Sequence, residues 1–392
     1  MATRLESLTD GSTQTSENTT MVEVVTDPAR LRDDWVALAG RASISPYQTY
    51  SFSWSWADTI GRIEDVQPFL VVARDETGRA AAILPLCVQQ RAGLKIALFL
   101  GGRESNFNLP ILDPNAHFDE ASLRNLLRRA AKVSDDPPDL IYLRNQPRRF
   151  EGVYNPLAFA EARPSASFAY GATLPARVED LGARLSKDAR KKLKKKEARL
   201  AELGELTYEH CATGARGDAI LEALIRQKSA RFSDMGVDDA FGRGVVTFLK
   251  RLQNETGDRA LELHALSVGG RIVATYAGIM RGGRFSGMLN SFDMDEEIAR
   301  SSPGDLLLHA LMRNLVSRGM THFDLGTGEA RYKNAVCDET IELCDFVLPV
   351  SARGAVAAPL FSAFLQLKRR VKQSPGLSRA YYRARRLIGR AK

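Results

Sequence analysis

Residues 302–333 read SPGDLLLHALMRNLVSRGMTHFDLGTGEARYK, a stretch that holds a helix, a strand and a glycine-rich turn. We expect the side chain of Ser302 to cap the helix and Asp305 to bond back toward the cap. The spacing of the leucines predicts one buried helix face, and Gly319 suits a left-handed turn at its end. The strand at 321–325 then leads into the turn. A helix N-terminus beside such a turn is a place where an anionic cofactor and a reacting amine can meet.

Length and composition limit the class of protein. The 392 residues predict two or three domains, and 44% hydrophobic with 26% charged residues is ordinary for a soluble globular chain. No apolar run approaches the roughly 20 residues of a membrane-spanning helix. The polar first 20 residues lack the apolar core of a signal peptide, so we expect a flexible tail. The cysteines form no CxxC pair, which predicts a reduced cytoplasmic protein without structural zinc or disulfides.

Positive charge gathers in two strips of the chain. Residues 346–392 contain 11 Lys/Arg and no acid, so the formal charge of +8 leaves −3 for the rest. A second cluster at 187–199 has 8 Lys/Arg against two acids. An acidic body with local basic strips argues against DNA binding and favours contact with phosphates, acidic lipids or a polyanionic cofactor.

The order of elements repeats within the chain. Residues 68–102 and 261–293 each predict a hairpin with a Gly-Arg turn followed by a third strand. A predicted helix and strand follow in each half: 120–132 and 140–144, then 305–318 and 323–325. We therefore expect an α+β protein of two related halves that arose by duplication, with chance similarity as the alternative.

The expected organisation has five parts. They are a flexible tail at 1–20, a first half at 21–180, a basic connecting helix at 181–205, a second half at 206–350 and a basic C-terminal tail at 351–392. The connecting helix is either a solvated connector or a basic wall that attracts a phosphate-bearing substrate. The C-terminal tail either lies on an anionic membrane surface or is merely solvated. The location is then cytoplasmic, with a peripheral position at the inner membrane face as an option.

Several motifs together resemble a known family. The motifs are Ser53-Trp54-Ser55-Trp56, Leu84-Pro85-Leu86, the basic stretch 186–199, Ser302-Pro303-Gly304 and the turn from Asp324 to Lys333. In combination they resemble the CelD/BcsL-like acyltransferases of the GNAT superfamily, relatives of the FemAB-like enzymes. The resemblance covers roughly residues 25–350. It implies tandem GNAT-type halves with mixed central sheets flanked by helices, and N-acyl transfer from acyl-CoA or an acyl carrier protein to an amine. It also implies a role in cell-envelope polysaccharide or lipid biosynthesis.

The sequence departs from the usual GNAT pyrophosphate loop, Arg/Gln-x-x-Gly-x-Gly/Ala. The corresponding place, 300–304, has one glycine and a shifted spacing. The helix N-terminus and Arg300 remain, so we assign donor binding to Arg300, Ser302 and Gly304. No metal is expected.

Transfer from a thioester to an amine requires a proton acceptor, an oxyanion site and a proton or positive field for the leaving thiolate. Glu329 is our first choice for the base, with Asp324 as a second carboxylate, and Tyr332 is assigned to protonate the leaving group. Lys333 would hold a phosphate or carboxylate of the substrate, with Gly326 and Gly328 in the binding turn. Structural roles for each of these side chains stay open. Amide substitution at Glu329 or Asp324 is expected to reduce transfer with little loss of stability.

Two other classes of function remain open. One is an aminoacyl-tRNA-dependent peptidyl transferase of the FemAB type, in which the basic 187–199 helix would grip RNA. The other is a non-catalytic protein of envelope polysaccharide assembly that retains only the fold. The acceptor amine, the acyl chain length and the oligomeric state are not readable from the sequence.

Overall fold

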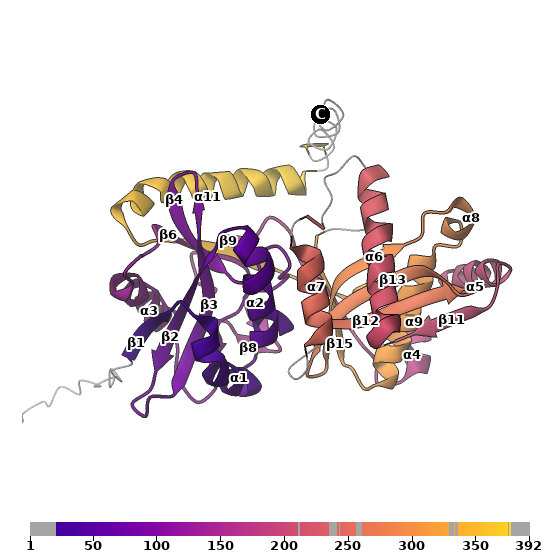
Figure 1. Ribbon diagram of the computed structural model, residues 1–392, viewed down its shortest axis with the longest axis horizontal. Helices are drawn as coiled ribbons and strands as arrows, with labels where there is room; N and C mark the ends of the chain where they lie inside the picture. Colours follow the sequence, from indigo (N-terminus) through magenta and orange to yellow (C-terminus); the bar gives the residue numbers. More distant parts are fainter. Residues whose placement is uncertain are drawn as a thin grey trace, which may run out of the picture.

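Two mixed β-sheets flanked by helices lie side by side in the computed structural model (Figure 1). The structure describes residues 21–210, 212–234, 241–242, 244–255, 261–328, 333, 336–374 and 376–377. The elements up to β10 are β1 Met21–Val25, η1 Pro28–Leu31, α1 Arg32–Arg41, η2 Pro46–Gln48, α2 Tyr50–Trp56, η3 Ala57–Gly61, β2 Gln67–Arg74, β3 Ala80–Arg91, β4 Leu94–Phe99, β5 Ile111–Leu112, α3 Glu120–Val133, β6 Leu140–Pro147, β7 Arg149–Phe150, β8 Val153–Tyr154, β9 Arg163–Pro164 and β10 Ala169–Thr173. The later elements are α4 Val178–Ala183, α5 Lys187–Ala201, β11 Leu206–Glu209, α6 Gly214–Asp234, α7 Val245–Asn254, β12 Leu261–Val268, β13 Arg271–Arg281, β14 Arg284–Phe292, α8 Glu296–Ala299, α9 Pro303–Ser317, β15 His322–Thr327, β16 Glu339–Ile341, β17 Leu343–Pro349 and α11 Ala352–Gln373.

Both sheets have the same plan. The first runs β1-β2-β3-β4-β6-β17-β9, with β5 on β3, and the second runs β11-β12-β13-β14-β15-β10-β16. In the first, α3 returns the chain from β4 to the parallel strand β6, and in the second α9 returns it from β14 to the parallel strand β15. The other pairings are antiparallel. This confirms the expected α+β class and the tandem order of elements.

The halves exchange one strand each. β10, which comes from the first half of the chain, pairs with β15 in the second sheet. β17, near the end of the chain, pairs with β6 in the first sheet. The preceding strands β9 and β16 stay in their own sheets. Consecutive segments such as 21–180 and 206–350 therefore describe the order of the chain, whereas each sheet is completed by a strand from the other half.

An apolar interior joins the halves. One cluster of buried side chains includes Trp35 and Trp56 from the first half and Leu249 from the second. Phe52 of α2 meets Phe248 of α7 edge to face, with ring centroids 5.4 Å apart. Burial of this shared apolar surface holds the two halves in one arrangement.

Helix α9 packs on the second sheet, on the face opposite to the apolar interior that joins the halves. Its leucines, such as Leu307, Leu311 and Leu315, are buried as their spacing predicts. Gly319 follows the helix with φ of +75°, which confirms the expected left-handed turn. On the first half, α11 lies as an outer layer beside β17 and β6 (Figure 1). Among the helices that the structure describes, none combines the length and hydropathy needed to cross a membrane.

Candidate active site

The parallel strands β14 and β15 run together over a short distance and then diverge. Their register pairs Arg284 with His322, Phe285 with Phe323 and Ser286 with Asp324. Beyond this point β14 continues to Phe292 while β15 pairs on its other side with β10. Diverging strands leave backbone amides and carbonyls without a ladder partner, so side chains or a bound polar group must complete their hydrogen bonds.

A residue of the first half closes one side of this opening. The Asn106 amide nitrogen donates to the Gly287 carbonyl at 3.3 Å, and its oxygen accepts the Thr327 amide proton at 3.1 Å. The same amide nitrogen donates to the Tyr47 hydroxyl at 2.6 Å. Gly326 has φ of +76°, and a Cβ there would lie 2.8 Å from the Asn106 side chain. Gly326 is therefore required for the first half to contact both diverging strands.

Asp324 lies at the point of divergence and is fully buried. It forms an ion pair with Arg284 at 2.5 Å and accepts a hydrogen bond from the Ser286 hydroxyl at 2.8 Å. The Arg284 guanidinium also lies over the Phe150 ring and 3.6 Å from a Glu151 carboxylate oxygen, both from the first half. Burial raises the pKa of Asp324, and Arg284 and Ser286 oppose that shift. Since both carboxylate oxygens are engaged, the geometry favours a role in fixing the strands, and a catalytic role stays a prediction.

A buried cation closes the glycine-rich turn. Lys333 is 4% exposed, and its ammonium donates to the carbonyls of Gly326 at 2.9 Å and Thr327 at 3.1 Å. It also lies 5.4 Å from the centroid of the Tyr170 ring on β10. Gly328 has φ of +93°, which favours glycine. The end of β15 thus carries a fixed positive charge beside the opening.

Two of the predicted catalytic residues, Glu329 and Tyr332, lie outside the described residues. Their roles as base and acid therefore stay predictions. Both belong to the segment between the Gly328 turn and the buried Lys333, so the chain connects them directly to the diverging strands.

The N-terminus of α9 differs in detail from the expected cap. Ser302 occupies the cap position in a left-handed conformation, with φ of 49°, and its side chain makes no capping hydrogen bond. Asp305 pairs with Lys196 of α5 at 2.6 Å, where we expected it to bond back to the cap. Arg300 is largely exposed and pairs with Glu296 at 2.5 Å. A Cβ on Gly304 would lie 3.6 Å from the Phe292 side chain, so this helix end lies beside the end of β14.

Two cations on α6 were not predicted as site residues. Lys228 donates to the Asn290 carbonyl at 3.1 Å, and the Arg231 guanidinium lies 5.1 Å from the centroid of the Phe292 ring. Both therefore cover the diverging end of β14. Burial lowers the pKa of Lys228 to about 8. In the sequence, Lys228 falls within the buried face of an amphipathic helix, and that position is the signal that would have identified it.

Helix α5 extends this positive region. Lys196 and Arg199 hold the helix against the start of α9, through Asp305 and the Arg300 carbonyl respectively. Ser186 caps α5 through its side chain, as predicted. A groove of about 990 Å³ between α4, α5 and α9 has Arg190, Lys194 and Arg313 among its lining residues. Helix α5, the predicted connecting helix, is thus packed on α9, whose N-terminus borders the opening.

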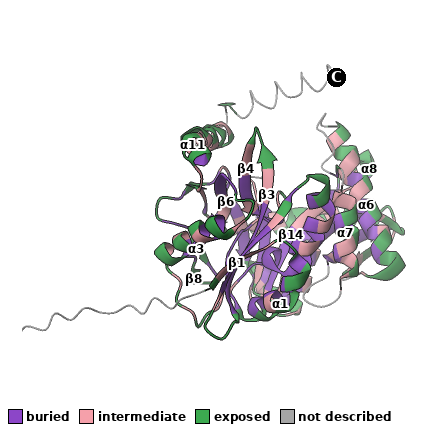
Figure 2. Cartoon of the chain, turned by 60° about the vertical axis from the view of Figure 1, so that its left-hand side comes forward, coloured by how far each residue is buried: buried purple, intermediate pink, exposed green. Residues whose placement is uncertain are grey.

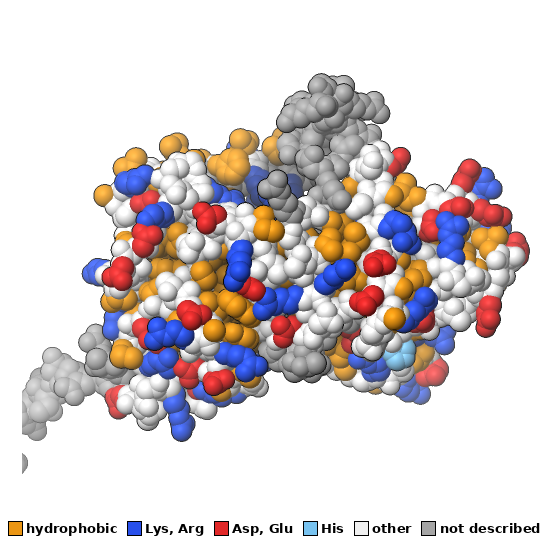
Figure 3. Space-filling model, in the orientation of Figure 1, with side chains coloured by type: hydrophobic (Ala, Val, Ile, Leu, Met, Phe, Trp, Pro, Cys, Tyr) orange, Lys and Arg blue, Asp and Glu red, His pale blue; other side chains and the backbone are white. Residues whose placement is uncertain are grey.

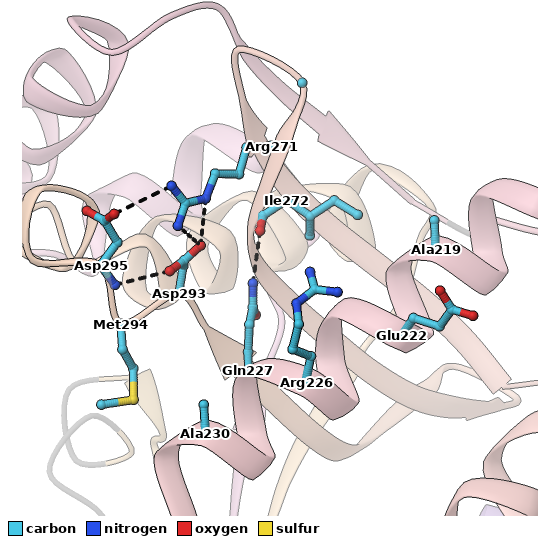
Figure 4. A pocket seen from close by; sticks show the side chains of 11 residues that line it. Ala219, Glu222, Arg226, Gln227, Ala230, Arg271, Ile272, Asp293, Met294 and Asp295 are labelled. Atoms are coloured by element: carbon cyan, nitrogen blue, oxygen red, sulfur yellow. Dashed lines mark hydrogen bonds and ion pairs between the residues drawn. The ribbon is translucent and has the colours of Figure 1, made fainter. Parts of the chain in front are cut away.

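A smaller pocket, of about 500 Å³, lies on the flank of α6 that faces the β12–β13 turn (Figure 4). Arg271 pairs there with Asp293 at 2.8 Å and Asp295 at 3.5 Å. Gln227 donates to the Ile272 carbonyl at 2.9 Å. The ion pairs of Arg271 with Asp293 and Asp295 fasten the β12–β13 turn to the segment between β14 and α8.

Comparisons with known proteins agree with this fold. Residues 187–334 match the family model of the acetyltransferase (GNAT) domain. FemX is similar in structure at 10% identity, with 85% of this chain and 98% of FemX covered and a TM-score of 0.55. The C-terminal domain of a putative lysylphosphatidylglycerol synthetase from Agrobacterium fabrum is similar at 13% identity, with coverage of 86% and 97% and a TM-score of 0.52. L-PGS from Bacillus licheniformis is similar at 13% identity, with coverage of 87% and 97% and a TM-score of 0.50. No curated protein matches the chain.

The chain therefore has a GNAT-type transferase fold, with a FemAB-like arrangement of two halves. The GNAT match includes β14, α9 and β15, so the opening described above lies within the matched region. The finer resemblance to the CelD/BcsL-like group stays a prediction.

Proposed function

We propose that the protein is an N-acyltransferase that moves an acyl group from acyl-CoA or an acyl carrier protein to an amine, in cell-envelope polysaccharide or lipid biosynthesis. The observation that carries the proposal is the divergence of β14 and β15 between a helix N-terminus and the buried cation Lys333. Past Ser286 the backbone of β14 no longer pairs with β15, which suits it to meet a carbonyl oxygen, and Lys333 offers positive charge to a leaving thiolate.

The anionic part of the donor is assigned to the start of α9. Pro303 has no N–H and the Asp305 amide bonds to the Ser302 carbonyl, so the contact would use the Gly304 amide and the partial positive charge of the helix end, which suit a phosphate. Arg300 and the turn around Ser302 and Gly304 supply the side-chain charge and the room for this contact. The thioester carbonyl would then lie between the diverging strands.

The reaction needs only groups that the chain contains or is predicted to contribute. The acceptor nitrogen attacks the thioester carbon, the carbon–sulfur bond breaks, and the amine proton passes to the base, for which Glu329 remains the first choice. Tyr332 is assigned to protonate the thiolate, and Lys333 adds a positive field. Lys228 and Arg231 border the opening from the α6 side, where they suit an acceptor that carries negative charge beside its amine.

A second donor class is favoured by α5. Its exposed cations lie on a helix that is fastened to the start of α9, as described above, so a polyanion bound along α5 would approach the same opening. A charged tRNA has this property, and its aminoacyl ester would replace the thioester. This is the runner-up to acyl-CoA.

The test is transfer by the purified full chain. Radiolabelled acetyl-CoA, long-chain acyl-CoA and charged tRNA are each offered with a panel of amines, and product is measured by scintillation counting. We expect Arg300→Glu to raise the KM for the active donor at least tenfold, because the variant loses a contact to a phosphate. Arg62→Glu, a reversal at a 75% exposed arginine of the first half, is the matched control and should leave KM unchanged. If no donor supports transfer and none binds, the protein is not a transferase of this kind.

A further inference from the structure

Helix α11 presents an apolar face to solvent. Val356, Leu360, Phe364 and Leu367 are exposed to 78%, 75%, 58% and 59%. Their spacing of four, four and three residues places them on one side of the helix. The smaller exposed residues that accompany them are also apolar: Ala352, Ala355, Pro359 and Ala363. We call this set of eight side chains the α11 apolar face.

The opposite side fixes the helix to the first half. A Cβ on Gly354 would lie 1.9 Å from a backbone oxygen of the first half, so the helix approaches very closely there. Phe361 meets Tyr142 edge to face at 5.2 Å between centroids, and Lys372 donates to the Ser167 hydroxyl at 2.9 Å. These contacts set the rotation of α11. The α11 apolar face therefore points outward because of how the helix is docked (Figure 2).

The charged side chains of α11 itself are all positive. The helix contains no Asp or Glu and carries Arg353, Lys368, Arg369, Arg370 and Lys372. Lys368 and Arg370 are exposed at the C-terminal end of the α11 apolar face. Other large exposed hydrophobic side chains, such as Ile63 and Val133, lie on separate elements. In Figure 3 hydrophobic side chains follow the edge of the molecule along which α11 lies.

We propose that α11 docks the protein on a bilayer surface that contains anionic lipid, with the α11 apolar face inserted at the interface. An exposed apolar stripe beside cations, without acids, is the pattern of interfacial helices. The anionic headgroups account for the cations, which an apolar protein surface would not require. This proposal does not depend on the transferase reaction.

The experiment is co-sedimentation of the full chain with phosphatidylcholine vesicles that contain or lack phosphatidylglycerol. We expect binding to the anionic vesicles and a loss of about 100-fold or more in partition for Leu360→Glu/Phe364→Glu. Lys368→Gln/Arg370→Gln should lose about 25-fold, at about fivefold for each charge, and this part should weaken with added salt. Ile63→Glu/Val133→Glu makes the same chemical change at scattered positions that are 50% and 55% exposed, and should reduce partition only by the general effect of added charge, about tenfold or less.

The outcomes separate the possible occupants of the face. Absence of vesicle binding, or equal binding by wild type and Leu360→Glu/Phe364→Glu, overturns the proposal. A dimer in light scattering that this variant converts to monomer, without vesicle binding, identifies a second copy as the occupant and also overturns it. A drop in the thermal midpoint of this variant, again without vesicle binding, shows that the chain itself covers the face.

Discussion

Replacing Asp324 by Asn should destabilise the protein strongly, although the change removes only a charge. The carboxylate and its partner Arg284 are 0% and 7% exposed, so the substitution leaves a buried guanidinium whose remaining counter-charge is Glu151, 3.6 Å away and 44% exposed. Breaking a buried pair in this way costs about 3–5 kcal/mol. At about 2–4 °C for each kcal/mol in a unit of 150–250 residues, the thermal midpoint should fall by about 6–20 °C. This replaces the expectation from sequence that the change would be nearly neutral for stability.

The assay is thermal unfolding followed by circular dichroism, with two comparisons. Asp293→Asn breaks the partly exposed pair with Arg271 and should cost about 0–1 kcal/mol. Arg284→Met combined with Asp324→Asn removes both buried charges and should recover part of the lost stability. A midpoint for Asp324→Asn within about 2 °C of wild type would refute the reasoning, because the pair would then contribute little to the contact between β14, β15 and the first half.

Three further predictions follow from single residues. Because burial lowers the pKa of Lys228 to about 8, its positive charge is lost above that pH, so KM for an anionic acceptor should rise there and Lys228→Arg should remove the rise in a pH series. Burial lowers the pKa of His264 below 6.5, so near and below that pH the unfolded chain binds a proton on this imidazole more readily than the folded chain does. Stability should therefore fall as pH drops below about 6.5, and urea denaturation of His264→Gln should show a weaker pH dependence. In Gly354→Ala the new Cβ would meet a backbone oxygen at 1.9 Å, so hydrogen exchange in α11 should become faster. In Gly40→Ala the new Cβ would have nothing within 4 Å, so the variant should stabilise α1 by about 0.5–1 kcal/mol. Equal changes in hydrogen exchange and stability for the two variants would contradict this.

Local signals predicted the local structure well. The apolar spacing and Gly319 located α9, and the Gly-Arg turns located the hairpins of both halves. The exchange of β10 and β17 was not predictable in the same way, because a short strand carries no mark of which sheet it will join. Its partner is chosen by long-range packing, which the pattern of one segment does not contain.

The residues of the candidate site also differ in how far the sequence could predict them. Asp324, Gly326 and Lys333 belong to one segment, and the sequence identified them together. Asn106 and Lys228 come from other elements and meet that segment only in the folded protein. Neighbouring residues of one turn could therefore be named together from the sequence, and their roles stay predictions, whereas contacts from distant elements such as Asn106 and Lys228 could not be named.

The exchange of strands has a consequence for synthesis on the ribosome. Strand β6 cannot pair with β17 until β17 has been synthesised. Tyr142 and its hydrogen-bond partner Asp345 are 203 residues apart in the chain. At about 5–20 residues per second, that distance takes about 10–40 s to translate. During this interval the open edge of β6 is available to other chains, which is a recognised route to aggregation. The nascent first half therefore keeps this edge unpaired until β17 has emerged.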